Sequence, residues 1–359
     1  MMGRKQGKMV IIIKSLCIGG AEHMVYELVK NLDNDRYEPY VLCYGKKLNT
    51  CLEDSMERVC HVSYLGEEGH IGIFAVLRVM KMLSFIKPDL VHSHMGGIAF
   101  AVPWSILYHR PLVVTIHTKP DMAFSKKNEI LLRLRLKIGK IKVVAVSHEN
   151  KLTVQKYFSL NEDKCTYVNN GINLSKYTHI PHKGFRFINV ARQDENKNQK
   201  AIIRCFDRIH NTYPFSRLML VGDGPCHNEL ITLANELRIA SSVEFPGMVD
   251  NPQGYYAVSD VYVQSSHREA MPLSVLEAMA AGLPLVSTDV GGLKDVVDEN
   301  GILVKDNDEQ ELFHAMLTMI EMPDWKIKMM QDASKKTAEK YSSEKMAEQY
   351  MEIYDELRE

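Results

Sequence analysis

Residues 265–286 read Ser265-Ser-His-Arg-Glu269-Ala-Met-Pro272-Leu-Ser-Val-Leu-Glu277-Ala-Met-Ala-Ala-Gly282-Leu-Pro-Leu-Val286. The short apolar runs Val261–Gln264 and Leu285–Thr288, on either side of the central part, predict buried parallel strands. Pro272 suits the first turn of a helix and Gly282 suits its end, so a helix is expected over 273–281. The stretch therefore predicts a strand–helix–strand unit, from which a parallel sheet covered by helices is built.

The same alternation of short apolar strands and longer helical periods continues in both directions. Further strands are expected at Met9–Ile13, Tyr37–Tyr44, Leu90–His92, Leu112–His117, Lys142–Ser147, Phe187–Val190, Arg217–Val221 and Val243–Phe245. Further helices are expected at Ala21–Leu32, Phe74–Ile86, Gln199–Asn211, Glu229–Leu237, Leu293–Val297 and Gln310–Ile320.

The alternation breaks once, at the polar and turn-rich segment Tyr177–Gly184, and then begins again. We therefore predict an α/β protein with two doubly wound, Rossmann-like domains, 1–180 and 181–340. The last residues, 341–359, are expected to form a helix. Ligands of such sheets bind at the carboxyl ends of the strands, so we expect the site in a cleft between two facing domains.

Composition limits the class of protein. The chain has 359 residues, 45% of them hydrophobic and 25% charged, which is typical of a soluble globular protein with two domains. Its seven cysteines form no C-x-x-C pair, which favours reduced thiols in a cytosolic protein. Cations are in excess before residue 180 and anions after it, which indicates either an anionic partner for one half or complementary domains.

Chemistry is suggested by the start of the helix predicted at 273–281. The backbone amides around Leu273 and Ser274 would be free donors at a helix N-terminus, which is a binding site for phosphate. Glu269 and Glu277 would point toward the same ligand. Carboxylates suit such a site if they accept hydrogen bonds from sugar or ribose hydroxyls. The alternative is that they are a surface carboxylate and a partner of the helix dipole.

With its neighbours, this segment resembles the retaining glycosyltransferases of family 4, which have the GT-B fold of two Rossmann-like domains. The resemblance covers nearly the whole chain. Its motifs are Glu269 and Glu277 in the spacing E-x7-E, Gly19-Gly20-Ala-Glu22, Val114-Thr-Ile-His117, Val168-Asn-Asn-Gly171, Ala191-Arg192 with Lys197, Gly222-Asp-Gly224-Pro and Pro246-Gly247. The chain departs from the family pattern at Ala191 and Ala270, because a glycine is usual at both positions.

The resemblance implies a role for each of these residues. Glu269 would accept hydrogen bonds from the donor sugar, and Glu277 would hold the ribose. Arg192, Lys197 and the amides of Leu273 and Ser274 would bind the diphosphate, whose charge grows as the glycosidic bond breaks. Donor-binding positions are also implied at Gly19, Gly20 and Gly247, and a histidine near the donor sugar and acceptor at His117.

No metal is expected, because these cations and amides would replace it. His92 and His94 share a strand face, but no third ligand is evident. The two D-x-D sequences, Asp33–Asp35 and Asp306–Asp308, lie in predicted polar turns. The chain has neither G-x-G-x-x-G after its first strand nor a P-loop, which argues against a nicotinamide enzyme or a P-loop NTPase.

Cations and apolar residues alternate over Ser125–Lys142 and predict a basic amphipathic helix. It would either lie on an anionic membrane surface or be a solvated face. We expect a cytoplasmic protein, with peripheral contact on the inner face of the membrane and no nucleic-acid partner.

The expected activity is transfer of a sugar from a nucleotide donor, UDP by family frequency, to a saccharide or lipid-linked acceptor in cell-envelope polysaccharide synthesis. The family implies retention, by front-face attack or, as the alternative, by double displacement through Glu269. Two other classes stay open: a nucleotide-sugar 2-epimerase of the same fold, and a non-catalytic subunit of a glycan-synthesis complex.

Overall fold

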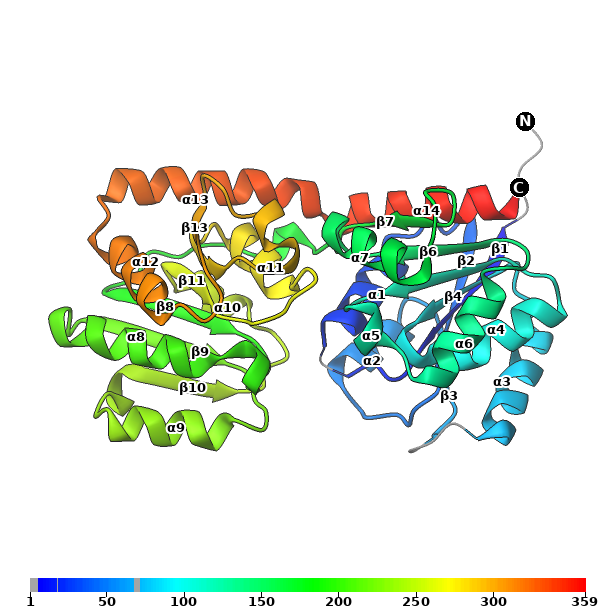
Figure 1. Ribbon diagram of the computed structural model, residues 1–359, viewed down its shortest axis with the longest axis horizontal. Helices are drawn as coiled ribbons and strands as arrows, with labels where there is room; N and C mark the ends of the chain where they lie inside the picture. The colour runs from blue at the N-terminus through cyan, green and yellow to red at the C-terminus, as the bar shows by residue number, and fades with distance from the viewer. Residues whose placement is uncertain (1–5, 18, 68–71) are drawn as a thin grey trace. The chain divides into compact units, whose positions relative to one another are not determined.

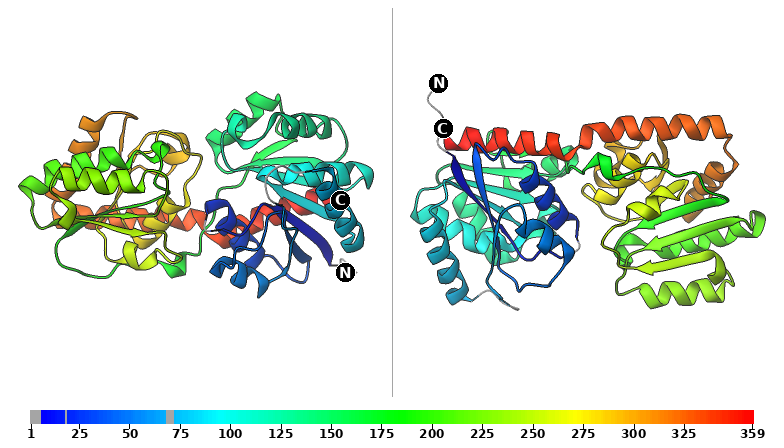
Figure 2. Two further views of the ribbon diagram at one scale, coloured as in Figure 1. Left: turned by 90° about the horizontal axis from the view of Figure 1, so that it is seen from below. Right: turned by 180° about the vertical axis from the view of Figure 1, so that it is seen from behind.

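The computed structural model describes residues 6–17, 19–67 and 72–359. It divides the chain into two compact units, of which the first comprises residues 1–171 and 343–359 and the second residues 172–342 (Figure 1). Each unit is a parallel sheet with helices on both faces (Figure 2). The fold predicted from the sequence, two Rossmann-like α/β domains, is confirmed.

The first unit contains a seven-stranded sheet in the order β3-β2-β1-β4-β5-β6-β7. Its strands are β1 (Gly7–Ile13), β2 (Tyr37–Cys43), β3 (His61–Tyr64), β4 (Leu90–His94), β5 (Leu112–Ile116), β6 (Ile141–Ala145) and β7 (Cys165–Tyr167). Its helices are α1 (Gly20–Lys30), α2 (Cys51–Glu57), α3 (Ile73–Ile86), α4 (Ile98–Leu107), α5 (Pro120–Ala123), α6 (Lys126–Arg135), α7 (His148–Phe158) and α14 (Ser343–Arg358).

Alternation along β1 explains the two layers of helices. Ile11 faces a core formed with α1 and α14, and Ile12 faces the core formed with α3, α4 and α6. Successive strand residues point to opposite faces of a sheet, so a continuous apolar run is required where both faces are covered. The C-terminal helix α14 contributes Tyr350 and Tyr354 to the first of these cores.

The second unit contains a six-stranded sheet in the order β10-β9-β8-β11-β12-β13. Its strands are β8 (Phe185–Val190), β9 (Ser216–Val221), β10 (Val243–Gly247), β11 (Val261–Gln264), β12 (Leu285–Thr288) and β13 (Gly301–Val304). Its helices are α8 (Gln199–Thr212), α9 (His227–Glu236), α10 (Gln253–Ala257), α11 (Leu273–Ala281), α12 (Glu309–Glu321) and α13 (Asp324–Ala338).

The first unit ends before the predicted boundary at residue 180, because the joining segment packs with the second unit. Ile172 and Tyr177 lie in a core of that unit. The backbone amide of Ile172 donates to the carbonyl of Tyr341 at 3.0 Å, and Ile172 forms an isolated parallel bridge with Ser342.

Two predicted helices differ in the structure. The predicted helix Leu293–Val297 is wrong: a 3-10 turn spans Gly291–Asp295, because Gly291 has a φ of +59° and the amide of Gly292 bonds the carbonyl of Ala270. The predicted helix Ser125–Lys142 is too long. It ends at Arg135, Gly139 follows with a φ of +67°, and Lys142 already belongs to β6.

Candidate functional site in the C-terminal unit

The candidate site of the second unit lies where the direction of the sheet's crossovers reverses. Strands β8 and β11 are neighbours in the sheet although β9 and β10 lie between them in sequence. Parallel α/β sheets bind ligands at such a switch point, beyond the carboxyl ends of the strands. Arg192 and Lys197 follow β8, and Glu269 follows β11.

The structure brings Lys197 and Glu269 together. The Nζ of Lys197 lies 2.5 Å from Oε1 of Glu269, and both side chains are mostly buried. The same Oε1 accepts a hydrogen bond from Nε2 of Gln264 at 3.1 Å. Burying a lone carboxylate is costly, so the cation and the amide stabilise the position of Glu269.

The loops that carry this pair hold one another in place. Asp194 accepts a hydrogen bond from the amide of Lys197 and so caps the short turn that ends at this lysine. The hydroxyl of Ser265 donates to the carbonyls of Lys197 and Asn198 at 3.0 and 2.9 Å. The amide of His267 donates to the carbonyl of Asn196 at 2.8 Å. Both loops are therefore fixed to each other through backbone groups.

The second carboxylate is linked to the first through tyrosines. The hydroxyl of Tyr262 lies 2.9 Å from Oε1 of Gln264 and 2.9 Å from Oγ of Ser274. The hydroxyl of Tyr256 lies 3.2 Å from the carbonyl of Ser274 and 2.9 Å from Oε2 of Glu277. Side-chain contacts therefore link Glu269 to Glu277 through Gln264, Tyr262, Ser274 and Tyr256.

Burial raises the pKa of Glu277 above its ordinary value, and hydrogen bonds from Tyr256 and Tyr177 oppose that rise. Sequence reasoning missed both tyrosines and also Tyr262 and Gln264. A signal was available for the last two, because residues i and i+2 of the strand β11 share a face.

The other predicted donor residues lie at the same edge of the sheet, but not all next to the pair. In the described residues no side chain caps α11, which leaves its first amides, including those of Leu273 and Ser274, for a ligand. Arg192 is largely exposed, 3.7 Å from Asp194. Gly247 ends β10, which β9 separates from β8, and its carbonyl accepts a hydrogen bond from the amide of Gly222.

In the first unit, the switch point between β1 and β4 lies beside a cluster of histidines. His94 ends β4, and its Nδ1 lies 2.8 Å from Nε2 of His117, which follows β5. His92 bonds Tyr354 and Thr115 through its two ring nitrogens, at 2.8 Å each. Both ring nitrogens of His92 are therefore occupied within the core, so His92 does not form a pair of metal ligands with His94.

Burial keeps this cluster neutral. It lowers the pKa of His117 to about 4 and that of His92 to about 3, and it lowers the pKa of His94 well below the ordinary value. A neutral imidazole can donate and accept hydrogen bonds but carries no charge. Gly19 caps α1, which begins at Gly20 beside the same switch point.

Both D-x-D sequences lie in turns, where one aspartate of each bonds a backbone amide. Asp33 accepts a hydrogen bond from the amide of Asp35, and Asp308 caps α12 by accepting one from the amide of Glu311. Asp306 lies 2.6 Å from Nδ1 of His267.

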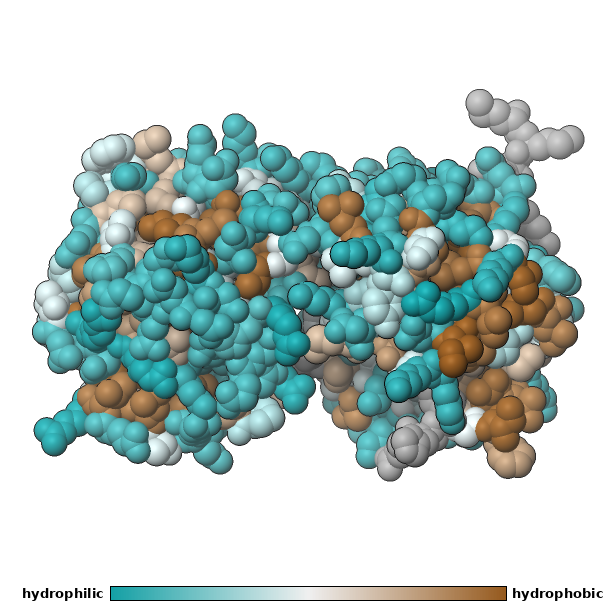
Figure 3. Space-filling model, viewed as in Figure 1, coloured by the Kyte–Doolittle hydropathy of each residue, from teal (hydrophilic) through white to brown (hydrophobic). Residues whose placement is uncertain are grey.

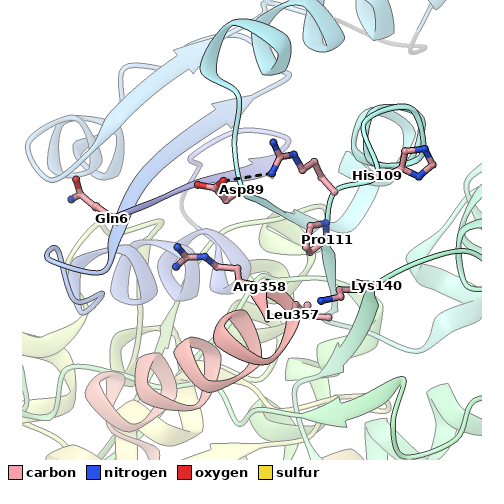
Figure 4. A pocket seen from close by; sticks show the side chains of 8 residues that line it. Gln6, Asp89, His109, Pro111, Lys140, Leu357 and Arg358 are labelled. Carbon is pink, nitrogen blue, oxygen red and sulfur yellow. Dashed lines mark ion pairs between the residues drawn. The ribbon is translucent and has the colours of Figure 1, made fainter. Parts of the chain in front are cut away.

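Cavities in both units are lined by described residues. One of about 180 Å³ adjoins the candidate site, because Asn198 and Ser265 are among its lining residues. Another of about 400 Å³ lies in the first unit, where Figure 4 shows Gln6, Asp89 and Lys140 around it. These three residues precede β1, β4 and β6, so this cavity lies at the amino edge of the sheet, away from the histidines.

Comparison with known proteins identifies the family of the chain. The family "Glycosyl transferases group 1" matches residues 184–322, and "Glycosyltransferase Family 4" matches residues 18–176. The chain belongs to the group 1 glycosyltransferases of family 4 type. Its fold is GT-B.

Individual relatives of this glycosyltransferase are distant but extensive. An uncharacterized glycosyltransferase of Methanocaldococcus jannaschii is 28% identical over 77% of this chain and 74% of its own length. The N-acetylgalactosamine-N,N'-diacetylbacillosaminyl-diphospho-undecaprenol 4-alpha-N-acetylgalactosaminyltransferase of Campylobacter jejuni is 24% identical over 88% of this chain and 90% of its own. HepE of Anabaena, solved in complex with UDP and glucose, has a TM-score of 0.85 and 20% identity, covering 98% of this chain and 100% of its own.

We predict that Gly291→Ala destabilises the glycosyltransferase. A Cβ at Gly291 would lie 2.1 Å from the carbonyl oxygen of Glu269, and the φ of +59° disfavours any side chain. The expected loss in the free energy of unfolding is roughly 1–3 kcal/mol, measured by urea denaturation. The matched control is Gly254→Ala, whose Cβ would meet no atom within 4 Å. Equal midpoints for the two variants would contradict the assigned loop contact.

We also predict that acid destabilises the histidine cluster. The pKa of His117 in the folded chain, about 4, lies below its ordinary value, so the unfolded chain binds the proton more tightly. The stabilisation is complete above about pH 6.5 and is lost as the pH falls toward 4. His117→Gln should therefore lose less thermal stability than the wild type between pH 7 and pH 5. His314→Gln, at an exposed histidine, should behave as the wild type does; identical slopes for all three proteins would refute the assignment.

Proposed function

We propose that this glycosyltransferase moves a sugar from a UDP-sugar to a hydroxyl of a saccharide or lipid-linked acceptor, with retention of configuration. The observation that carries the proposal is the pair of Lys197 and Glu269 at the switch point between β8 and β11. The UDP and glucose bound by HepE support the choice of donor.

The pair suits a donor whose phosphates carry charge and whose sugar carries hydroxyls. In the proposed complex, the cation of Lys197 turns to the diphosphate, and Glu269 accepts hydrogen bonds from the sugar. Arg192 adds a second cation. Its side chain is exposed, and its Nε lies 3.7 Å from Oδ2 of Asp194. The free amides at the start of α11 add the field of the helix terminus. These groups stabilise the negative charge that grows on the leaving diphosphate.

Retention follows, in this proposal, from attack on the same face that the diphosphate leaves. The leaving phosphate takes the proton of the acceptor hydroxyl, so Glu269 needs no nucleophilic role. Glu269 already accepts a hydrogen bond from Gln264 and forms an ion pair with Lys197. These contacts are expected of a carboxylate that binds by accepting hydrogen bonds. Neutral His117, paired with His94, would orient hydroxyls without adding charge. Gly19 and Gly20, at the start of α1, would let a phosphate approach the backbone closely, because they have no side chains.

No metal is needed for this chemistry in the proposal, because Lys197, Arg192 and the helix amides supply the positive charge. Turnover should therefore not depend on added Mg²⁺. A nucleotide-sugar 2-epimerase would form its product without an acceptor, so acceptor-dependent release of UDP separates the two activities.

We predict that Lys197→Ala and Glu269→Ala each abolish transfer while the chain stays folded. Losing one preorganised group that stabilises the transition state costs about 10²–10³ in turnover. A panel of nucleotide sugars, assayed for UDP release, identifies the donor first, and circular dichroism checks the fold. The matched control is Lys200→Ala, whose lysine pairs instead with Glu195 and Glu229. Turnover like that of the wild type in either folded site variant would exclude the proposed site.

We further propose that the acceptor is met at an anionic membrane surface in cell-envelope polysaccharide synthesis. The Campylobacter jejuni relative acts, by its name, on a diphospho-undecaprenol saccharide. Within the described residues, no helix is both long enough and apolar enough to cross a bilayer. We propose a peripheral contact, on the cytoplasmic side.

The surface proposed for this contact differs from the predicted basic helix. Arg135 is buried and bonds the hydroxyl of Ser105, while Lys142 is buried against Glu356, so neither can meet lipid. Instead α3 exposes an outward stripe with Phe74, Leu77 and Phe85, up to 89% exposed, on the face opposite its buried residues. Helix α4 packs against α3 and α6, and Figure 3 shows apolar atoms gathered over this part of the unit.

We predict that Phe74→Ser with Phe85→Ser weakens binding to anionic vesicles. Exposed cations of α6, Lys126 and Lys127, would supply attraction to the lipid, and the two rings would bury apolar area. The expected loss is roughly tenfold or more in partitioning, measured by sedimentation with vesicles containing phosphatidylglycerol. Phe215→Ser, at an exposed ring of the second unit, is the control and should bind as the wild type does. Equal binding by all three proteins would reject this surface.

A further inference from the structure

The segment that joins the two units carries two histidines beside an aspartate of the second unit. His179 and His182 lie in this segment, and Asp260 directly precedes β11. The amide of Ile180 donates to the carbonyl of Ala257 at 2.7 Å, which fixes the segment to the loop that leads to Asp260. The three side chains are therefore brought together by backbone contacts on both sides.

Their potential ligand atoms form a compact triangle. One nitrogen from each imidazole and one oxygen of Asp260 all lie within 4.8 Å of one another. The Nε2 of His182 is 3.5 Å from Oδ1 of Asp260. Two ligands that bind one zinc ion at about 2.0–2.1 Å in a tetrahedron lie roughly 3.3 Å apart. The spacing of this pair is thus close to that of two zinc ligands.

His182 is the least satisfied member of the cluster. Its side chain is only 8% exposed, and neither ring nitrogen has a hydrogen-bond partner among the described residues. Buried polar groups in folded proteins are almost always paired, and no described residue gives this ring a hydrogen bond. An ion between His182 and Asp260 would satisfy it.

The other two groups are oriented as metal ligands usually are. His179 bonds the backbone of Ser259, and its Nε2 is buried and unpartnered, so the free nitrogen is the one available to an ion. Burial lowers the pKa of His179, which favours the neutral form that binds metals. Asp260 accepts a hydrogen bond from the amide of Arg186 at 2.7 Å through Oδ2, which leaves Oδ1 toward His182. A partner on the far atom is what commonly orients a ligand.

We propose that His179, His182 and Asp260 bind a zinc ion, with water as the fourth ligand. Two neutral imidazoles and one carboxylate form a donor set that suits zinc and is open at one position. The ion would brace the joining segment against the loop before β11. It would not take part in sugar transfer, because none of the three residues belongs to the Lys197–Glu269 network.

A second group in the second unit, Glu195, Cys226 and Glu229, also places ligand atoms close together. It is a weaker candidate, because Lys200 already pairs with both glutamates. The alternative for the first group is a contact between His182 and Asp260 alone. That explanation leaves the unpartnered Nε2 of His179 without a role.

The test is zinc binding by the full chain after treatment with a chelator, measured by isothermal titration with ZnCl₂ alone. We expect one equivalent to bind to the wild type and at least about 100-fold weaker binding to His179→Ala and to His182→Ala. Even loss of a group that only orients a ligand costs about 10–100-fold. His314→Ala and Cys226→Ser are the matched controls and should bind zinc as the wild type does.

A second measurement keeps the test decisive if an alanine variant folds poorly. Co²⁺ bound in a tetrahedral site absorbs visible light strongly, so the wild type should develop this absorption and the conservative variant Asp260→Asn should lose much of it. Zn²⁺ should also raise the melting temperature of the wild type but not of His182→Ala. Absence of zinc binding by the wild type, or equal binding by the ligand variants, would overturn the proposal.

Discussion

The hydrogen-bonded ion pair between Lys197 and Glu269 is the contact on which the candidate site of the second unit depends. The two residues are 72 positions apart in the chain, and they meet only because β8 and β11 are neighbours. A carboxylate this well buried is tolerated because a cation and an amide share its charge. Bonds from Ser265 and His267 to the lysine's loop then hold the pair at the end of the sheet. The order of the strands in the sheet therefore determines which residues meet in the site.

The fold was predictable because its signals are local. Runs such as Met9–Ile13 are apolar at every position, as a strand covered on both faces must be, and Pro272 and Gly282 mark the ends of α11. Two predicted helices were wrong in extent or type, and a glycine lies at each of them. Gly139 and Gly291 adopt a positive φ that ends one predicted helix and tightens another into a turn. Apolar spacing alone does not reveal that a glycine will leave the helical region.

The sequence identified the charged residues of the candidate site but not the residues that hold them in place. Glu269, Glu277 and Lys197 belong to motifs that can be found in a sequence. Tyr256 lies on α10 and reaches Glu277 on α11, a contact that depends on how two helices pack. No spacing rule connects the two residues. The basic stretch failed for a related reason, since Arg135 and Lys142 look exposed in sequence but bond backbone carbonyls in the core.

The candidate edges of the two sheets differ in their electrostatics. At the switch point of the first sheet, burial holds His94 and His117 neutral, so that edge offers hydrogen bonds without charge. At the switch point of the second sheet, Lys197 and Arg192 pair with Glu269 and Asp194, and the uncapped start of α11 adds free amides. A neutral imidazole can both donate to and accept from a hydroxyl, whereas the free amides of a helix terminus favour an anion. The two sheet edges therefore differ in the groups that they offer to a ligand, although both lie at a switch point of a parallel sheet.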